Sequence, residues 1–249
     1  MARQSGLLKI KGTIGGMTFY KSQDGDLVRE KGGVDGSRIA NDPAFVRTRE
    51  NGEEFGAAGK AGKVLRDGLR PMMLNAADGR VTARVTQTMT DITKLDTTSA
   101  RGKRTPAIGL AGAAGKALLK GFNFNTNAVL GAVLYKPYAV NTTTGVITIA
   151  ALVPINDISY PAGATHMSIS GAYGNINFAT GVVAVSLTNV VNLVINGTSG
   201  AVTLTPTAVP AGTGIKVYLL KIEFFQMVNA VQYSLKNGAY NALAIVEVA

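Results

Sequence analysis

The residue types that carry most enzyme chemistry are scarce in this chain of 249 residues, which has one histidine and no cysteine. His166 stands beside Thr165 and Ser168, in a segment that alternates like a β-strand. A hydrolytic site needs a nucleophile, a base and an orienting acid, and no serine here has a nucleophile-elbow sequence around it. We therefore expect His166 to be a strand residue with a local hydrogen bond. The lack of cysteine also removes disulfides, thiolate metal ligands and a thiol nucleophile.

Two glycine-lysine pairs resemble the end of a phosphate-binding loop. Gly59-Lys60 and Gly115-Lys116 are each followed by alanine, whereas the loop needs a hydroxyl residue there for magnesium. Leu110 also occupies the position where the second pair would need a glycine for the turn. With one histidine and no acidic loop of calcium-site spacing, the chain offers no set of metal ligands either. We expect no enzyme activity, no cofactor and no metal.

Basic residues are a feature that fits binding to an anionic partner such as a nucleic acid. The net charge is +10, and residues 1–120 hold 21 Lys and Arg against 12 Asp and Glu, while residues 121–249 hold 4 against 3. Backbone phosphates require only such charges. Acidic residues dilute the first helix, however, and aromatic residues for stacking on bases are few, so a solvated mixed-charge surface is the alternative. Some of the basic residues are candidates for one of two roles, as contacts made by an N-terminal docking arm or as contacts to a nucleic acid. They are Lys9, Lys11, Lys21, Arg29, Lys31, Arg101, Lys103 and Arg104.

The first basic residues lie in a stretch that predicts a small β-meander. Strands are expected at 8–11, 17–21 and 27–31, with an Asp-Gly turn signal at 22–26 between the last two. We expect Lys9, Lys11, Lys21, Arg29 and Lys31 to form one basic face. A ribbon this short is marginally stable alone, so it needs another surface on which to pack.

A long helix is expected to follow, from Pro43 to Leu69. Asn41 and Asp42 are good capping residues, and proline fits the first helical position. Each interior glycine costs about 1 kcal/mol relative to alanine. Close packing of backbones is one reason to keep such glycines, and a kinked or broken helix is the alternative. The glycines recur at spacings of three and four, at Gly52, Gly56, Gly59 and Gly62.

Two more helices are expected, at 78–95 and 107–120, separated by an exposed basic loop at 97–106. The sequence Gly-Ala-Ala-Gly-Lys-Ala occurs at 56–61 and again at 112–117. Two such small-residue faces would allow close helix packing. Coincidence in a region rich in alanine and glycine explains the match equally well.

After Phe122 the apolar period changes to two, which predicts strands. Short strands at regular spacing, with turn signals between them, favour an antiparallel β-sandwich that is immunoglobulin-like in outline. The expected fold class is α+β: an N-terminal module with a meander and helices at 1–120, and a sandwich at 121–249. The expected strands are 128–135, 145–152, 165–171, 182–187, 192–195, 201–205, 215–226 and 239–248.

Charge is unusually sparse in the expected sandwich, with seven Lys, Arg, Asp and Glu in residues 121–249. A free-standing soluble domain keeps about a quarter or more of its surface charged. Extended apolar surface usually marks an interaction site, so we expect subunit contacts there. A surface covered by threonine, asparagine and serine is the alternative.

The stretch KIKGTIGGMTFYKSQDGDLVREKGG, followed by NDPAFVRTRENGEEFGAAGKAG, resembles uncharacterised protein families of the Bacteroidetes. These families look like a glycine-rich meander, a helix and a β-rich C-terminal half. The resemblance brings no assigned activity and no site residues. It implies a place among phage or prophage structural components.

Two functions remain from the sequence. The first is a non-enzymatic structural protein that self-assembles as a virion or virion-like component, with itself and other virion proteins as partners and residues 1–33 as a docking arm. The second is a nucleic-acid-binding protein that uses the basic module, with the sandwich as an interaction domain. No signal peptide or membrane-spanning segment is expected, so the expected location is the virion or the cytoplasm.

Overall fold

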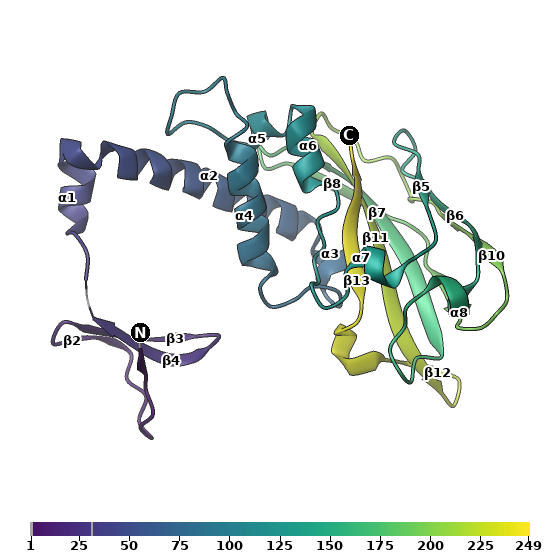
Figure 1. The fold of residues 1–249 in the computed structure, drawn as a ribbon. Helices are drawn as coiled ribbons and strands as arrows, with labels where there is room; N and C mark the ends of the chain where they lie inside the picture. The colour runs from purple at the N-terminus through teal and green to yellow at the C-terminus, as the bar shows by residue number, and fades with distance from the viewer. Residues whose placement is uncertain (1, 31) are drawn as a thin grey trace. The chain divides into compact units, whose positions relative to one another are not determined.

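The computed structural model describes residues 2–30 and 32–249, without the side chains of residues 236 and 237. It contains helices and antiparallel sheets together, so the fold class is α+β, as the sequence predicted. The chain divides into two compact units, Met1–Arg49 and Glu50–Ala249 (Figure 1). The boundary expected near residue 120 therefore falls inside the second unit.

The first unit begins with a four-stranded antiparallel sheet in the order β1-β4-β3-β2. The predicted strand at 8–11 is absent, because the Gln4 side chain bonds both backbone groups of Ile10, at 2.9 and 3.2 Å. The β3–β4 hairpin closes where Ser22 pairs with Gly25, so the predicted turn is confirmed. The strands are β1 (Ala2–Arg3), β2 (Gly12–Ile14), β3 (Met17–Ser22) and β4 (Gly25–Glu30).

No residue of the first unit is buried, within the described ranges 2–30 and 32–49. The strands are two to six residues long, and one sheet of this size has no second layer against which to bury its apolar side chains. Leu7, Leu8, Ile14 and Met17 are all exposed. The first unit therefore has secondary structure without a hydrophobic core of its own.

The long helix begins and ends close to the predicted residues. The short helix α1 (Gly36–Asn41) precedes it, and a 3-10 turn, η1 (Pro43–Phe45), leads directly into α2 (Val46–Gly68). The Asp42 carboxylate accepts a hydrogen bond from the Ala44 amide at 2.9 Å, which confirms the predicted cap. The helix runs without a break through all four glycines.

The second unit is built on a six-stranded antiparallel sheet. Its two longest strands, β7 and β11, pair from Ile176 opposite Ile215 to His166 opposite Phe225. Strands β8 and β9 follow one another along the outer side of β7, and β12 and β13 do the same along β11. The strands are β7 (His166–Ile176), β8 (Val183–Leu187), β9 (Val191–Val194), β11 (Ile215–Val228), β12 (Val231–Ser234) and β13 (Ala242–Val248).

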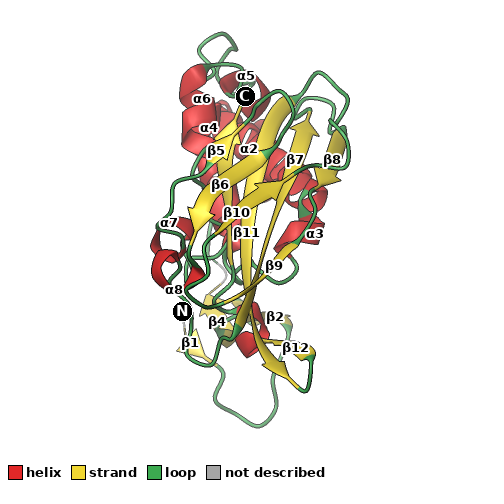
Figure 2. Ribbon diagram, turned by 90° about the vertical axis from the view of Figure 1, so that its right-hand side faces the viewer, coloured by secondary structure: helices red, strands yellow, loops and turns green. Residues whose placement is uncertain are grey.

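Both faces of this sheet are covered within the chain. Val217 and Leu219 belong to a core shared with the helices, while Tyr218 and Leu220, which alternate with them, belong to a core shared with a second sheet. That sheet has the order β10-β6-β5, formed by β5 (Ala139–Val140), β6 (Ile147–Leu152) and β10 (Gly200–Leu204). Figures 1 and 2 show it on the opposite side of the larger sheet from helices α4 (Val81–Thr93) and α6 (Ala113–Leu119).

This double burial gives the sparse charge of residues 121–249 a cause inside the chain. Strands buried on both faces consist almost entirely of apolar residues. The apolar run in β11 therefore does not by itself require contact with another subunit, whereas Val182, Val190 and Val194, in and beside β8 and β9, remain at least half exposed.

Two of the remaining predictions gave the wrong secondary structure. Residues 128–135, predicted as a strand, contain the helix α7 (Leu130–Val133), and the predicted helix at 107–120 is two short helices. The predicted helix at 78–95 is present but shorter. The helices between α2 and α7 are α3 (Arg70–Met73), α4 (Val81–Thr93), α5 (Pro106–Gly109) and α6 (Ala113–Leu119). The helix α8 (Pro154–Asp157) and the 3-10 helix η2 (Leu235–Gly238) lie further along the chain.

Candidate functional site

The predicted cationic cluster lies in the loop between α4 and α5, and each of its cations meets an acid on α2. Arg101 Nε lies 3.3 Å from a carboxylate oxygen of Glu50. Lys103 Nζ lies 2.7 Å from Glu53. Arg104 binds both carboxylate oxygens of Glu54, at 2.6 and 2.7 Å. We call these three pairs the ion-pair ladder.

The helix geometry explains why the ladder forms. Glu50, Glu53 and Glu54 are spaced by three and four residues, so they lie on one side of α2. The loop approaches the helix closely at Gly102, which has φ +85°, and a Cβ there would come 2.9 Å from the Glu50 side chain. The Gly102 amide also donates a hydrogen bond of 2.7 Å to Glu54. Glycine at 102 therefore allows the close approach that the ion pairs need.

Asp96 holds the start of the loop. Its buried carboxylate accepts hydrogen bonds from the amides of Thr98, Ser99 and Thr105 at 3.0 to 3.1 Å, and from the Thr98 hydroxyl at 3.0 Å. Burial alone would raise the pKa of Asp96, but hydrogen bonds from Ser99, Thr105 and Thr98 outweigh it and hold the pKa well below its usual range. Asp96 thus stays ionised as an anchor for the loop.

The ion-pair ladder makes the cations of the loop less available to a phosphate. The hydrogen bond from Arg104 lowers the pKa of Glu54, and Glu54 in turn raises the pKa of Arg104, so both stay charged and paired. A phosphate would have to compete with three carboxylates for these cations. Three of the four acids that dilute the predicted helix, Glu50, Glu53 and Glu54, pair with the loop, while Asp67 pairs with Lys63 of the same helix.

The N-terminal cations do not gather on one face. In the β3–β4 ladder Lys21 lies opposite Asp26, and Arg29 lies opposite Thr18, so Lys21 and Arg29 project from opposite faces of the sheet. Lys9 and Lys11 lie in the loop before β2, where Lys9 donates to the Gln4 carbonyl oxygen. Lys31 lies outside the described residues.

His166 has the local contact expected of it. Its Nδ1 lies 2.9 Å from the Thr165 hydroxyl oxygen. Within residues 2–30 and 32–249, no group of three or more His, Asp or Glu is placed to hold a metal ion.

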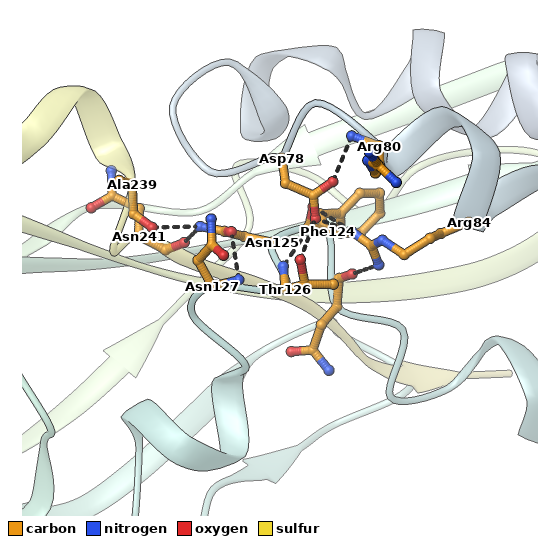
Figure 3. Close-up of polar contacts among 10 residues, drawn as sticks. Asp78, Arg80, Arg84, Phe124, Asn125, Thr126, Asn127, Ala239 and Asn241 are labelled. Atoms are coloured by element: carbon orange, nitrogen blue, oxygen red, sulfur yellow. Dashed lines mark hydrogen bonds and ion pairs between the residues drawn. The ribbon is translucent and has the colours of Figure 1, made fainter. Parts of the chain in front are cut away.

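The structure also contains a polar cluster that the sequence did not indicate (Figure 3). Asp78 accepts hydrogen bonds from the Thr126 amide at 3.0 Å and hydroxyl at 3.1 Å, and it pairs with Arg84. Arg84 also donates to the Phe124 carbonyl oxygen at 2.9 Å. The buried Asn241 bonds the Asn75 carbonyl oxygen at 2.8 Å and the Phe224 amide at 3.1 Å. These bonds join the helices to the sheets, and they indicate a stabilising role rather than a ligand site.

No helix in the part of the chain that the structure describes is long and apolar enough to cross a membrane. Comparisons of the chain with protein-family models, curated proteins and solved structures gave no match.

Proposed function

We propose that this chain is a non-enzymatic structural protein that self-assembles as a virion or virion-like component, with residues 1–33 as a docking arm. The observation that carries the proposal is the first unit, which buries none of its described residues. Removal of exposed apolar side chains from water is favourable, and the first unit has four large ones, Leu7, Leu8, Ile14 and Met17. Contact with a neighbouring subunit would supply the missing layer of packing.

Deletion of residues 1–33 tests the arm. We expect the full chain to form particles or oligomers well above 25.8 kDa in light scattering and electron microscopy. The truncated chain should be a monomer that still unfolds cooperatively, because both hydrophobic cores lie in the second unit. A control with Lys9 and Lys11 changed to glutamine should still assemble. A full-length protein that stays monomeric at high micromolar concentration contradicts the proposal, as does normal assembly of the truncated chain.

Nucleic-acid binding is the second candidate, favoured by the net charge of +10. The ion-pair ladder counts against the cluster at 101–104 as its site, because those cations are already paired. Binding through backbone phosphates predicts affinity that falls steeply with salt. If the cluster at 101–104 is the site despite these ion pairs, neutralising Arg101, Lys103 and Arg104 together weakens binding in a mobility-shift titration. No shift with DNA or RNA at low salt contradicts it.

We also propose that the two sheets pack in an immunoglobulin-like sandwich. Support comes from the core that they share, where Ile147 and Leu204 of the small sheet meet the cluster of Tyr218 and Leu220. The helices on the outer face of the larger sheet are an addition to that plan. A solved structure whose strand order departs from an immunoglobulin sandwich would reject this part of the proposal.

A further inference from the structure

The second unit has a small groove of about 230 Å³ where α2 ends and α3 follows it. Two arginines and one acid supply its charged lining, and three apolar residues supply the rest. Pockets that hold a whole drug-sized ligand usually measure about 300–1,000 Å³. This groove therefore fits one functional group with its nearest substituents better than a molecule of that size. The lining residues are Arg66, Asp67, Arg70, Met73, Leu74 and Ala77.

The two arginines of the groove have no partner among the described residues. The Nε atom of Arg66 is buried without a hydrogen-bond acceptor, and neither Arg66 nor Arg70 forms an ion pair or hydrogen bond with any described residue. Arg84 also has a buried Nε without an acceptor, but its terminal nitrogens bind Asp78 and two carbonyl oxygens. A buried donor without an acceptor is costly. The Arg66 guanidinium is thus partly withdrawn from water without the acceptor that would offset this.

Asp67, the acid of the groove, does not supply that acceptor. Its carboxylate pairs with Lys63, one turn earlier in α2. The hydrogen bond from Lys63 is the main cause that lowers the pKa of Asp67, and the positive charges of Arg66 and Arg70 make smaller contributions. Lys63, Arg66 and Arg70 against Asp67 leave three positive charges and one negative charge, a net charge of +2. The groove therefore favours an anion.

We propose that this groove binds a phosphate group through Arg66 and Arg70. A guanidinium presents its N–H groups in a planar fork that matches the oxygens of a phosphate. A phosphate has enough oxygens to accept from both arginines at once, whereas one bidentate fork already occupies both oxygens of a carboxylate.

The apolar wall adds to the proposal. Met73, Leu74 and Ala77 line the same hollow, and Leu74 is 69% exposed. These side chains would contact the carbon atoms to which the phosphate is attached. The site is separate from the ion-pair ladder, and it goes beyond the proposed function, because assembly can succeed or fail whatever the groove binds.

Titration of the full chain with inorganic phosphate tests the site, with the arginine Nε–H signals followed by NMR. We expect the Arg66 signal to shift until binding saturates, because its Nε–H gains an acceptor. Sodium chloride at the same ionic strength should leave that signal in place. In calorimetry, Arg66→Gln and Arg70→Gln should each weaken phosphate binding at least roughly tenfold, since each removes charge-assisted hydrogen bonds.

Lys60→Gln is the matched control. It removes one positive charge from an exposed position on the same helix, outside this groove. Charges in water at a distance from the site are largely screened by salt, so this variant should change the affinity by less than roughly twofold. Because Arg70 is exposed, Arg70→Gln should keep the fold, and it tests the site even if Arg66→Gln does not fold.

Two further probes distinguish the sources of the phosphate. If a short DNA strand shifts the Arg66 signal and binds more tightly than a nucleoside monophosphate, the group belongs to a nucleic-acid backbone. If the monophosphate binds more tightly, the group belongs to a small phosphate ester. Three results overturn the proposal: an Arg66 signal that none of the phosphate probes moves, an equal shift with chloride, and arginine variants that lose no more affinity than Lys60→Gln.

Discussion

At the scale of single residues, Asp96 makes the sharpest prediction about stability. In Asp96→Asn an amide nitrogen would face backbone donors that now bond a carboxylate oxygen. We expect a loss of about 1–3 kcal/mol in the free energy of unfolding, because buried donors lose their partner. Thermal and urea unfolding at pH 7 measure the loss. Thr143→Ala, in an exposed turn, is the control and should change little.

The same residue predicts a pH dependence. The folded-state pKa of Asp96 lies below the unfolded value of about 3.9. Its contribution is therefore complete above about pH 5 and is lost as the pH falls toward the folded-state pKa. The difference in stability between the natural chain and Asp96→Asn should shrink as the pH falls below about 4. A constant difference from pH 7 to pH 3 would contradict the assignment.

A second residue-scale prediction concerns the turn between β11 and β12. Asn229 and Ala230 both have positive φ, at 49° and 62°, as a type I′ turn requires. Asparagine tolerates this region, whereas alanine is strained there by about 1 kcal/mol. Ala230→Gly should raise the free energy of unfolding by roughly 0.5–1 kcal/mol. Ala150→Gly, in a strand at negative φ, should lower it; a loss of stability in both variants would argue against the turn.

At the scale of elements, the repeated hexapeptide shows that one local sequence has two environments. A Cβ at Gly59 of α2 would meet nothing within 4 Å, whereas a Cβ at Gly115 of α6 would lie 2.1 Å from the Gly109 carbonyl oxygen. Gly59→Ala should stabilise the protein by about 1 kcal/mol through helix propensity. Gly115→Ala should destabilise it, because backbone must move to admit the methyl group. Denaturant unfolding of the two variants checks the signs, and equal effects would contradict the packing.

The elements also show what the sequence could and could not predict. Period-two segments such as 215–226 were found as strands, and the Asp42-Pro43 start located the long helix, because these signals are local. The strand predicted at 8–11 failed, since Gln4 bonds the backbone of Ile10 from six residues away. Of the four glycines for which close packing was predicted, only Gly62 has a near neighbour, and that neighbour is a side chain, because a Cβ there would lie 3.1 Å from Cγ1 of Val85; Gly52, Gly56 and Gly59 face open space.

The candidate site was predictable only where its residues are neighbours in the sequence. Arg101, Lys103 and Arg104 are a local cluster and were found. Their acids lie some fifty residues earlier on α2, so the pairing depended on a tertiary contact that no local pattern gives. The cluster at Asp78 and Asn241 likewise joins distant segments through ordinary polar residues.

At the scale of the whole molecule, the burial of the larger sheet on both faces explains two results: its apolar character and the union of helices and strands in one unit. Leu65 and Ile92 of the helices share a core with Leu219 and Ile245 of the sheet. The same sheet is covered on its other face by the small sheet. The apolar character of β11 therefore has an internal cause, and the helices cannot be separated from the strands at residue 120 without opening a core.

Two fragments test this organisation. Residues 42–249 keep the Asp42 cap and both hydrophobic cores, so this fragment should be monomeric and unfold cooperatively. Residues 121–249 lack α2 to α6 and would expose the apolar face that holds Val217, Leu219, Leu243 and Ile245. We expect that shorter fragment to aggregate, or to bind a hydrophobic dye without a cooperative thermal transition, because an open core face of this kind is not stable in water. If residues 121–249 instead form a monomer with a sharp transition, the strands are an independent domain and the helices are an addition to it.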